Sequence, residues 1–295
     1  MKGPGSRGPF LFSYTNSIFM HIAIQGFEGS FHQIAVQKYF GKQNTIEACA
    51  SFPELVRKVK NGEAGVDGGM MAIENSIAGS ILPNYSLLKN SGLHITGELY
   101  LQINQQLMVL PGQSIEDIRE VHSHPMALLQ CMDFLAKYPH IKLVETEDTA
   151  LSAKHVRQKK LKSTAAIAGQ LAAEIFELDI IAPNIHTAKN NYTRFLAISR
   201  NGVEAPADAN KSSVYFQTSN ESGSLAKVLT KIAAEGINLS KIQSFPIPAK
   251  EWHYYFHADM EFDTLAHFQQ ALKKITPLTE HLTVLGIYKK GKTHN

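Results

Sequence analysis

The chain has few cysteines and little net charge. Cys49 and Cys131 are its only cysteines among 295 residues, which excludes a disulfide scaffold, and we expect both to be small core residues in a reducing compartment. The net charge is +3, and the lysines and arginines are scattered apart from short runs. The composition therefore gives no support for nucleic-acid binding.

Long hydrophobic runs are also lacking. No segment has the roughly 20 apolar residues that a helix needs to cross a bilayer, so we expect no membrane partner. Residues 1–19 contain Gly, Pro and Ser with only short apolar runs, which predicts a disordered tail rather than a secretory signal. Met20 is a candidate for the natural start, and we expect a cytoplasmic protein. An apolar fraction of 44% is enough for one large domain and a smaller one.

The first motif joins a short apolar strand, residues 21–25, to a predicted helix over 30–39 through a turn that contains Gly26 and Gly29. Ser30 can cap this helix and leave its first backbone N–H groups free to bind an anion. The glycine spacing is not that of the dinucleotide-binding fingerprint, so no dinucleotide is implied. Taken alone, an ordinary strand-turn-helix connection is the commoner interpretation.

The second motif follows an amphipathic helix at 52–61 and a predicted buried strand at 64–73. Glu74, Asn75 and Ser76 come directly afterwards, at the carboxyl end of that strand, where open α/β sheets bind ligands. A cap of the next helix by Asn75 or Ser76 is an equally good interpretation.

The third motif is Ser123-His124-Pro125, which follows the strand-like segment 95–110. Pro125 suits the first position of a helix, with Ser123 or His124 at its cap. His122 and His124 have no third ligand at a convincing spacing, so we expect a ligand site at a helix start or a plain cap, and no metal.

The fourth motif comes after two predicted helices, at 148–161 and 165–177, the second of which is rich in alanine. Thr193 and Arg194 stand beside each other at the edge of an apolar strand, 195–198. Arg194 offers a planar fork of donors suited to a carboxylate, and Thr193 offers a small donor and acceptor. This pair predicts recognition of an acidic small molecule.

In their order and spacing, the four motifs resemble those of the prephenate dehydratase family. The resemblance covers about residues 21–199. Residues 26–31 resemble the family's Gly-Pro-x-Gly-Thr-Phe, and 73–80 its Pro-Ile-Glu-Asn-Ser-x-x-Gly. Ser123-His124-Pro125 with Gln130-Cys131 matches the third motif, and 191–195 matches the fourth, whose threonine the family regards as essential. The departures are Phe27, Ser30, Ala72, Ala78 and Met126, but Ser30 keeps a hydroxyl and we treat the site as intact.

The resemblance implies a catalytic domain over residues 20–199, made of two α/β lobes hinged as in type II periplasmic binding proteins, with a cleft between the lobes. It implies that prephenate loses carbon dioxide and its ring hydroxyl to give phenylpyruvate, without a cofactor. The catalytic residues that it implies are Thr193, Arg194 and Phe195, and the substrate-binding residues are Ser30, Glu74, Asn75, Ser76, Ser123 and Asn191.

Two roles remain open for several of these residues. Thr193 is expected to act on the leaving hydroxyl, as a hydrogen-bond donor or a proton relay. Glu74 is either a partner in that proton transfer or a structural hydrogen-bond acceptor at the strand end. Arg194 either pairs with a substrate carboxylate or forms an internal ion pair that shapes the cleft.

A polar, proline-containing linker at 200–211 separates a second domain, 212–290, from the first, and residues 291–295 are expected to form a tail. The domain has a strand-helix-strand-strand-helix-strand pattern, with strands at 212–218, 237–247, 251–262 and 281–288 and helices at 223–235 and 265–275. This ferredoxin-like α+β pattern resembles the ACT domain, the amino-acid-sensing module of the family.

The motifs for phenylalanine sensing are present in altered form. Gly223, Ser224 and Leu225 stand for the family's Gly-Ala-Leu. In the family's Lys-Ile-Glu-Ser-Arg-Pro, Gln243 and Phe245 replace the glutamate and the arginine, whereas Ser244 and Pro246 are kept. The resemblance implies L-phenylalanine as the effector and pairing of such domains into a homodimer or homotetramer.

Arogenate dehydratase and a catalytically silent amino-acid sensor are the alternatives to prephenate dehydratase. Retention of Thr193 favours an enzyme over the sensor. Only nineteen residues precede the predicted catalytic domain, too few for a fused chorismate mutase domain, so we expect the monofunctional form.

Overall fold

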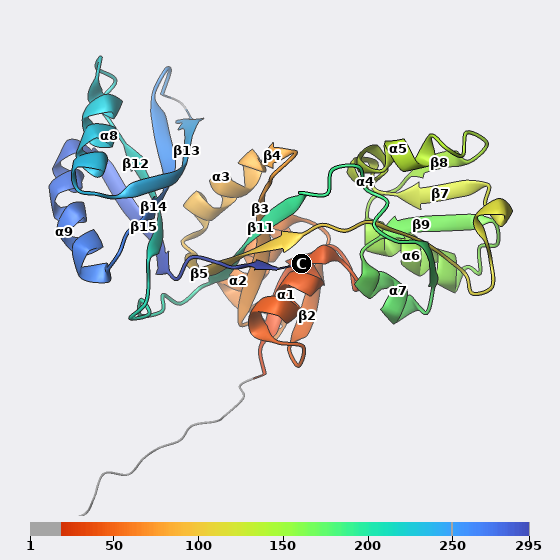
Figure 1. The fold of residues 1–295 in the computed structure, drawn as a ribbon. Helices are drawn as coiled ribbons and strands as arrows, with labels where there is room; N and C mark the ends of the chain where they lie inside the picture. Colours follow the sequence, from red (N-terminus) through yellow and green to blue (C-terminus); the bar gives the residue numbers. More distant parts are fainter. Residues whose placement is uncertain (1–18, 249, 295) are drawn as a thin grey trace, which may run out of the picture.

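The computed structural model describes residues 19–248 and 250–294. Within these residues the strands form three sheets, which lie in a row (Figure 1). The tail predicted at 1–19 lies outside the described residues, apart from Phe19. No helix in the described ranges is long and apolar enough to span a membrane.

The first lobe, in the middle of the row, is built on a sheet with strand order β16-β5-β11-β3-β1-β2, with β4 paired to β3 (Figure 1). β1, β2 and β3 are parallel, whereas β11 runs antiparallel to both β3 and β5. The strands are β1 His21–Gln25, β2 Thr45–Cys49, β3 Gly68–Asn75, β4 Gly79–Ser80, β5 His94–Gln102, β11 Tyr192–Ser199 and β16 Thr293–His294. The helices are α1 Phe31–Phe40, α2 Phe52–Asn61 and α3 Leu82–Ser91, and a 3₁₀ turn covers Glu63–Gly65.

The chain crosses after β5 into the second lobe and returns before β11. The sheet of this lobe has strand order β10-β6-β9-β7-β8. Its strands are β6 Gln106–Val109, β7 Glu120–Ser123, β8 Lys142–Glu145, β9 Thr164–Ala168 and β10 Asp179–Ala182. Its helices are α4 Pro125–Gln130, α5 Met132–Leu135, α6 Thr149–Gln158 and α7 Gln170–Phe176, and a 3₁₀ turn covers Ile115–Asp117.

The helix predicted at 165–177 is wrong over its first part. Residues 164–168 form β9, a strand buried along its whole length between β6 and β7, and only 170–176 form helix α7. Burial in the middle of a sheet has overridden the helix preference of the alanines. The strand predicted at 64–73 is also displaced: β3 begins at Gly68 and includes Glu74 and Asn75.

The third sheet is antiparallel, with strand order β13-β14-β12-β15, and helices α8 and α9 pack on one face of it (Figure 1). The elements are β12 Lys211–Gln217, α8 Ser224–Ala234, β13 Asn238–Pro246, β14 Tyr254–Glu261, α9 Leu265–Ile275, the 3₁₀ turn Thr276–Leu278 and β15 His281–Tyr288. Their order agrees with the order predicted from the sequence.

The C-terminal domain is packed tightly against the first lobe. Tyr85 and Ile95 of the first lobe share an apolar core with Phe245, Tyr255 and other residues of the C-terminal sheet. Gly286 of β15 is needed for this contact, because a Cβ at that position would lie 2.0 Å from the Ile95 carbonyl oxygen. The two parts therefore form one packed unit rather than two domains on a loose linker.

The tail predicted at 291–295 is wrong for its described residues, 291–294, and Asn295 lies outside the described residues. Thr293 and His294 form β16, which pairs in parallel with Tyr100 and Leu101 of β5. The C-terminal segment thus returns from the second domain and becomes part of the sheet of the first lobe.

Candidate active site

A cavity of about 370 Å³ lies between the two lobes, a volume that suits a small metabolite. The first lobe contributes Ser30, His32, Asn75, Thr193 and Phe195, among others, and the second lobe contributes residues that include His124, Gln130 and Asp148. The first, second and fourth sequence motifs therefore contribute residues to the first-lobe wall of the cavity, and the third motif contributes His124 to the opposite wall. We call this cavity the interlobe pocket.

Thr193 is held in the pocket by the amide of Asn75. Asn75 Nδ2 donates to Thr193 Oγ1 at 3.0 Å and to Asn191 Oδ1 at 2.7 Å, while Asn75 Oδ1 accepts from the backbone N–H groups of Ile77 and Ala78. Because the threonine oxygen accepts this bond, its own proton remains available for donation to a bound molecule. Asn191 does not line the pocket and acts on it only through Asn75.

Helix starts converge on the interlobe pocket from both lobes. Ser30 caps α1 by accepting from Gln33 N at 3.4 Å, and Asp148 caps α6 by accepting from Leu151 N at 2.9 Å. His124 caps the short helix α4 in the same way. The described lining contains no lysine or arginine, so neutral donors and helix N-termini must provide any attraction for an anion.

His32 and Asp148 also line the pocket, although neither belongs to one of the four sequence motifs. His32 Nε2 accepts from Ala72 N at 3.3 Å, and its ring meets the ring of Phe195 edge-on at 5.0 Å between centroids. Burial lowers the pKa of His32 to about 3, so its ring is neutral at pH 7. The sequence does carry a signal for His32. It lies two residues after the Ser30 cap, in the first turn of the helix that follows strand β1.

Arg194 faces away from the interlobe pocket, because successive side chains on a strand alternate between the two faces. Its Nε donates to Glu98 Oε2 at 2.7 Å, and its Nη1 pairs with Asp259 of β14. Lys211 Nζ donates to Glu98 Oε1 at 2.9 Å, and Tyr288 also contacts the guanidinium. We call Arg194, Glu98, Lys211, Asp259 and Tyr288 the junction cluster.

The junction cluster is buried and its four charges balance. Burial alone would lower the pKa of Arg194 and raise that of Asp259, because it disfavours both charged forms. Their mutual attraction outweighs burial, with Glu98 and Tyr288 adding to the effect on Arg194 and His257 to that on Asp259. The pKa of Arg194 therefore lies well above its usual range, and that of Asp259 well below. The cluster joins the C-terminal domain to the first lobe through the buried ion pairs Arg194–Asp259 and Lys211–Glu98.

A sequence model of the family described as "Prephenate dehydratase" matches residues 22–203, which include both lobes and every residue of the interlobe pocket. The chain belongs to the prephenate dehydratase family. This membership agrees with the expectation from the four motifs.

The similarity to curated relatives covers more of this prephenate dehydratase family member than residues 22–203. The bifunctional chorismate mutase/prephenate dehydratase of Enterobacter agglomerans is 31% identical, over 90% of this chain and 70% of the relative. The chloroplastic arogenate dehydratase/prephenate dehydratase 2 of Arabidopsis thaliana is 34% identical, over 97% of this chain and 77% of the relative.

Solved structures give the same picture of the fold. The prephenate dehydratase of Arthrobacter aurescens, in complex with L-Phe, aligns with a TM-score of 0.81 at 26% identity, over 92% of this chain and 90% of the other. GqqA, described as a novel type of quorum quenching acylases, aligns with a TM-score of 0.83 at 29% identity, over 92% of this chain and 98% of the other.

Three of the residues predicted to bind substrate, Glu74, Ser76 and Ser123, do not line the interlobe pocket. Glu74 pairs with Lys241 of β13, and Ser76 Oγ donates to the Asn190 carbonyl at 3.1 Å and accepts from Tyr192 N at 2.9 Å. Ser123 is fully buried and donates to the Ile167 carbonyl at 2.6 Å. Glu74, Ser76 and Ser123 are therefore engaged in structural contacts.

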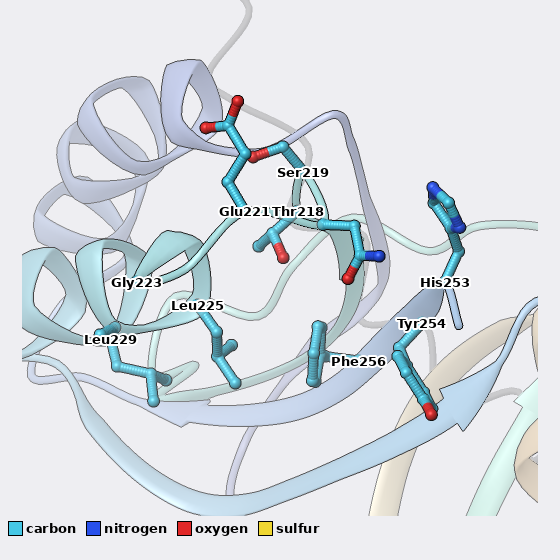
Figure 2. Close-up of a pocket in the computed structure, with 11 residues that line it drawn as sticks. Thr218, Ser219, Glu221, Gly223, Leu225, Leu229, His253, Tyr254 and Phe256 are labelled. Carbon is cyan, nitrogen blue, oxygen red and sulfur yellow. The ribbon is translucent and has the colours of Figure 1, made fainter. Parts of the chain in front are cut away.

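A second cavity, of about 420 Å³, lies in the C-terminal domain between the start of α8 and strand β14 (Figure 2). Leu225 and Leu229 of α8 and Phe256 of β14 form its apolar side, and Ser219, Glu221 and His253 are among its polar lining. We call it the C-terminal pocket.

Only part of the predicted effector site lies at the C-terminal pocket. Gly223 and Leu225 line it, and Ser224 Oγ hydrogen-bonds Ser219 Oγ at 2.8 Å. Gln243, Ser244, Phe245 and Pro246 lie on β13 and do not line it. Phe245 instead stacks on Tyr255, at 5.0 Å between ring centroids, and contacts Tyr85 of the first lobe, so this residue of the motif serves the domain junction.

Proposed function

We propose that the chain converts prephenate to phenylpyruvate, carbon dioxide and water in the interlobe pocket, without a cofactor. The observation that carries the proposal is the Thr193 hydroxyl, fixed by Asn75 with its proton free, on the wall of a pocket formed by helix starts. The substrate already holds the driving force, since its ring becomes aromatic. The protein has to position two carboxylates and assist departure of the hydroxyl.

Within this proposal, Thr193 donates a hydrogen bond to the leaving hydroxyl. The helix N-termini capped by Ser30 and Asp148 attract the carboxylates, which lack any described lysine or arginine partner in the pocket. Phe195 provides an apolar wall beside the substrate ring, and its own ring is held edge-on by His32.

Arg194 has the internal role rather than the substrate-binding role in this proposal. Its guanidinium is 4% exposed and already holds two carboxylates. Removing it from Glu98 and Asp259 to reach a substrate would leave both buried charges without their partner, which is costly. Glu74 likewise serves as the partner of Lys241.

We further propose that the two lobes, residues 20–199, form a type II periplasmic-binding-protein-like catalytic domain, and that 200–211 link it to an ACT domain at 212–290. L-Phenylalanine is the proposed effector, supported by its presence in the Arthrobacter aurescens relative. The C-terminal pocket, with apolar and polar sides, suits an amino acid. A homodimer or homotetramer remains the proposed assembly.

A single strand connects the proposed effector site with the catalytic residue. β14 carries Phe256, which lines the C-terminal pocket, and Asp259, which pairs with Arg194 beside Thr193. A shift of β14 on effector binding would therefore be felt at β11. Coupling between such sites is typically worth about 1–3 kcal/mol.

The test measures phenylpyruvate formation from prephenate by purified protein, with and without L-phenylalanine, and repeats it with arogenate. We expect turnover of prephenate that phenylalanine reduces. Arogenate dehydratase is the second candidate, because the Arabidopsis relative is named for both activities. Turnover of arogenate alone would replace the proposal with this candidate. Turnover of neither would favour a silent sensor. Acylase activity is assayed in parallel because of the similarity to GqqA, and acylase turnover alone would replace the proposal.

A further inference from the structure

The proposed reaction consumes one proton in each turnover. The bond between the ring and its carboxylate breaks, carbon dioxide leaves, and the electron pair of that bond enters the ring. The ring C–O bond breaks at the same time, and the hydroxyl must take up a proton to leave as water. Prephenate dianion and one proton thus give phenylpyruvate anion, carbon dioxide and water. The hydroxyl of Thr193 is a far weaker acid than a carboxyl, so the pocket needs another source for this proton.

Asp148 is the one carboxyl group among the described residues that line the interlobe pocket. Its Oδ1 accepts from Leu151 N at 2.9 Å as the cap of α6. Its Oδ2 faces the first lobe, since a Cβ added to Gly26 would lie 3.1 Å from that oxygen. The glycine therefore leaves room for a carboxyl oxygen between the two walls of the pocket.

No cation within the described ranges forms a salt bridge with Asp148. Burial raises the pKa of Asp148, and the backbone donors at the start of α6 oppose that rise only in part. His124 and Glu147 are the nearby titratable groups on the second lobe, and the neutral His32 faces the pocket from the first. Two substrate carboxylates would raise the pKa of Asp148 further.

We propose that Asp148 is the general acid of the reaction, which gives its proton to the leaving ring hydroxyl while Thr193 donates a hydrogen bond to the substrate. Water restores the proton after products leave. This inference rests on the proposed dehydratase function. The two groups that act on the leaving hydroxyl thus stand on opposite walls of the pocket, Thr193 on the first lobe and Asp148 on the second.

Asp148→Asn is the decisive variant, because asparagine caps a helix as well as aspartate and has nearly the same shape but cannot act as the acid. We expect kcat to fall about 10²-fold or more, within the usual range of general acid catalysis, with an unchanged melting temperature. In the wild type, kcat should decline as pH rises through the pKa of Asp148 in the substrate complex. That decline should be absent from the residual activity of Asp148→Asn.

A control variant separates capping from acid catalysis. Asp148→Ser also caps α6 but has no carboxyl, so it should lose activity as Asp148→Asn does, and it repeats the test if asparagine disturbs the fold. Wild-type turnover together with unchanged kcat and pH profile in these variants would overturn the role of Asp148 alone. A wild type that does not turn over prephenate would overturn the proposed function and this inference together.

Discussion

The two faces of strand β11 have opposite surroundings. Thr193 and Phe195 face the interlobe pocket, where the described lining has no lysine or arginine and its one carboxyl is Asp148. Arg194, between them, faces the junction cluster, where four charges are buried together. One face is arranged to receive a molecule and the other to fix a domain. Under the proposed function, three consecutive residues of one motif serve chemistry and assembly in alternation.

The largest expected effect tests the pocket face. Thr193→Ala should reduce kcat by about 10²–10⁴-fold, because the leaving hydroxyl loses its hydrogen-bond donor. The free energy of unfolding should change little, since among the described residues the side-chain hydroxyl hydrogen-bonds with Asn75 alone, and that amide keeps its bond to Asn191. Steady-state kinetics and urea unfolding measure the two quantities. Thr193→Ser, which keeps a hydroxyl, is the control, and equal activity of the alanine variant would remove Thr193 from the reaction.

The junction face should respond in the opposite way. Arg194→Met should lower the free energy of unfolding by about 3–5 kcal/mol, because Glu98 and Asp259 are left buried without their partner. The Michaelis constant for prephenate should stay close to the wild-type value at temperatures where the variant is folded. An increased Michaelis constant with unchanged stability would instead support a substrate carboxylate as the partner of Arg194.

The surroundings of His32 on the pocket face can be tested by the pH dependence of the free energy of unfolding. The pKa of His32 is lowered to about 3 in the fold, so below its ordinary value of 6.5 the unfolded chain binds a proton that the folded chain does not. The folded state should therefore lose stability as pH falls from 6.5 towards 3, by up to about 1.4 kcal/mol per pH unit from this residue. Urea unfolding at several pH values should show a smaller slope for His32→Gln, and equal slopes would contradict a buried neutral His32.

The smallest expected effect concerns a third ion pair between the domains, Lys241–Glu74. Lys241 and Glu74 are partly exposed, so Lys241→Met should change the free energy of unfolding by only about 0–1 kcal/mol. Activity should be retained, because Glu74 lies outside the pocket. Loss of activity in Lys241→Met with intact stability would show that Glu74 matters for the reaction after all.

The sequence could locate the elements better than the partners of individual residues. Alternation along β11 predicts that Thr193 and Phe195 share one face and that Arg194 has the other, but it does not tell which face borders the pocket. The partners of Arg194, Glu98 and Asp259, are far away in the chain and belong to no motif. A buried ion pair made by tertiary packing has no local signal, so the two roles considered for Arg194 could not be separated.

The incorrect elements have similar causes. The alanines of β9 look helical by local preference, and only their position between β6 and β7 makes them a strand. Thr293 and His294 have no strand pattern of their own and pair because β5 offers an unoccupied edge. In the sequence Asp148 is only the first residue of a predicted helix, and its proposed role as the acid depends on the other lobe opposite it.

Strand β16 has a consequence for the order of synthesis on the ribosome. β5 is made early, but its outer edge is paired only by residues that follow the entire C-terminal domain. Gly291, just before β16, also donates its N–H to Glu98 of β5 at 3.1 Å. Until these residues emerge, the nascent first lobe exposes an open strand edge, which other chains can pair with. Completion of the sheet of the first lobe is therefore a late event in synthesis.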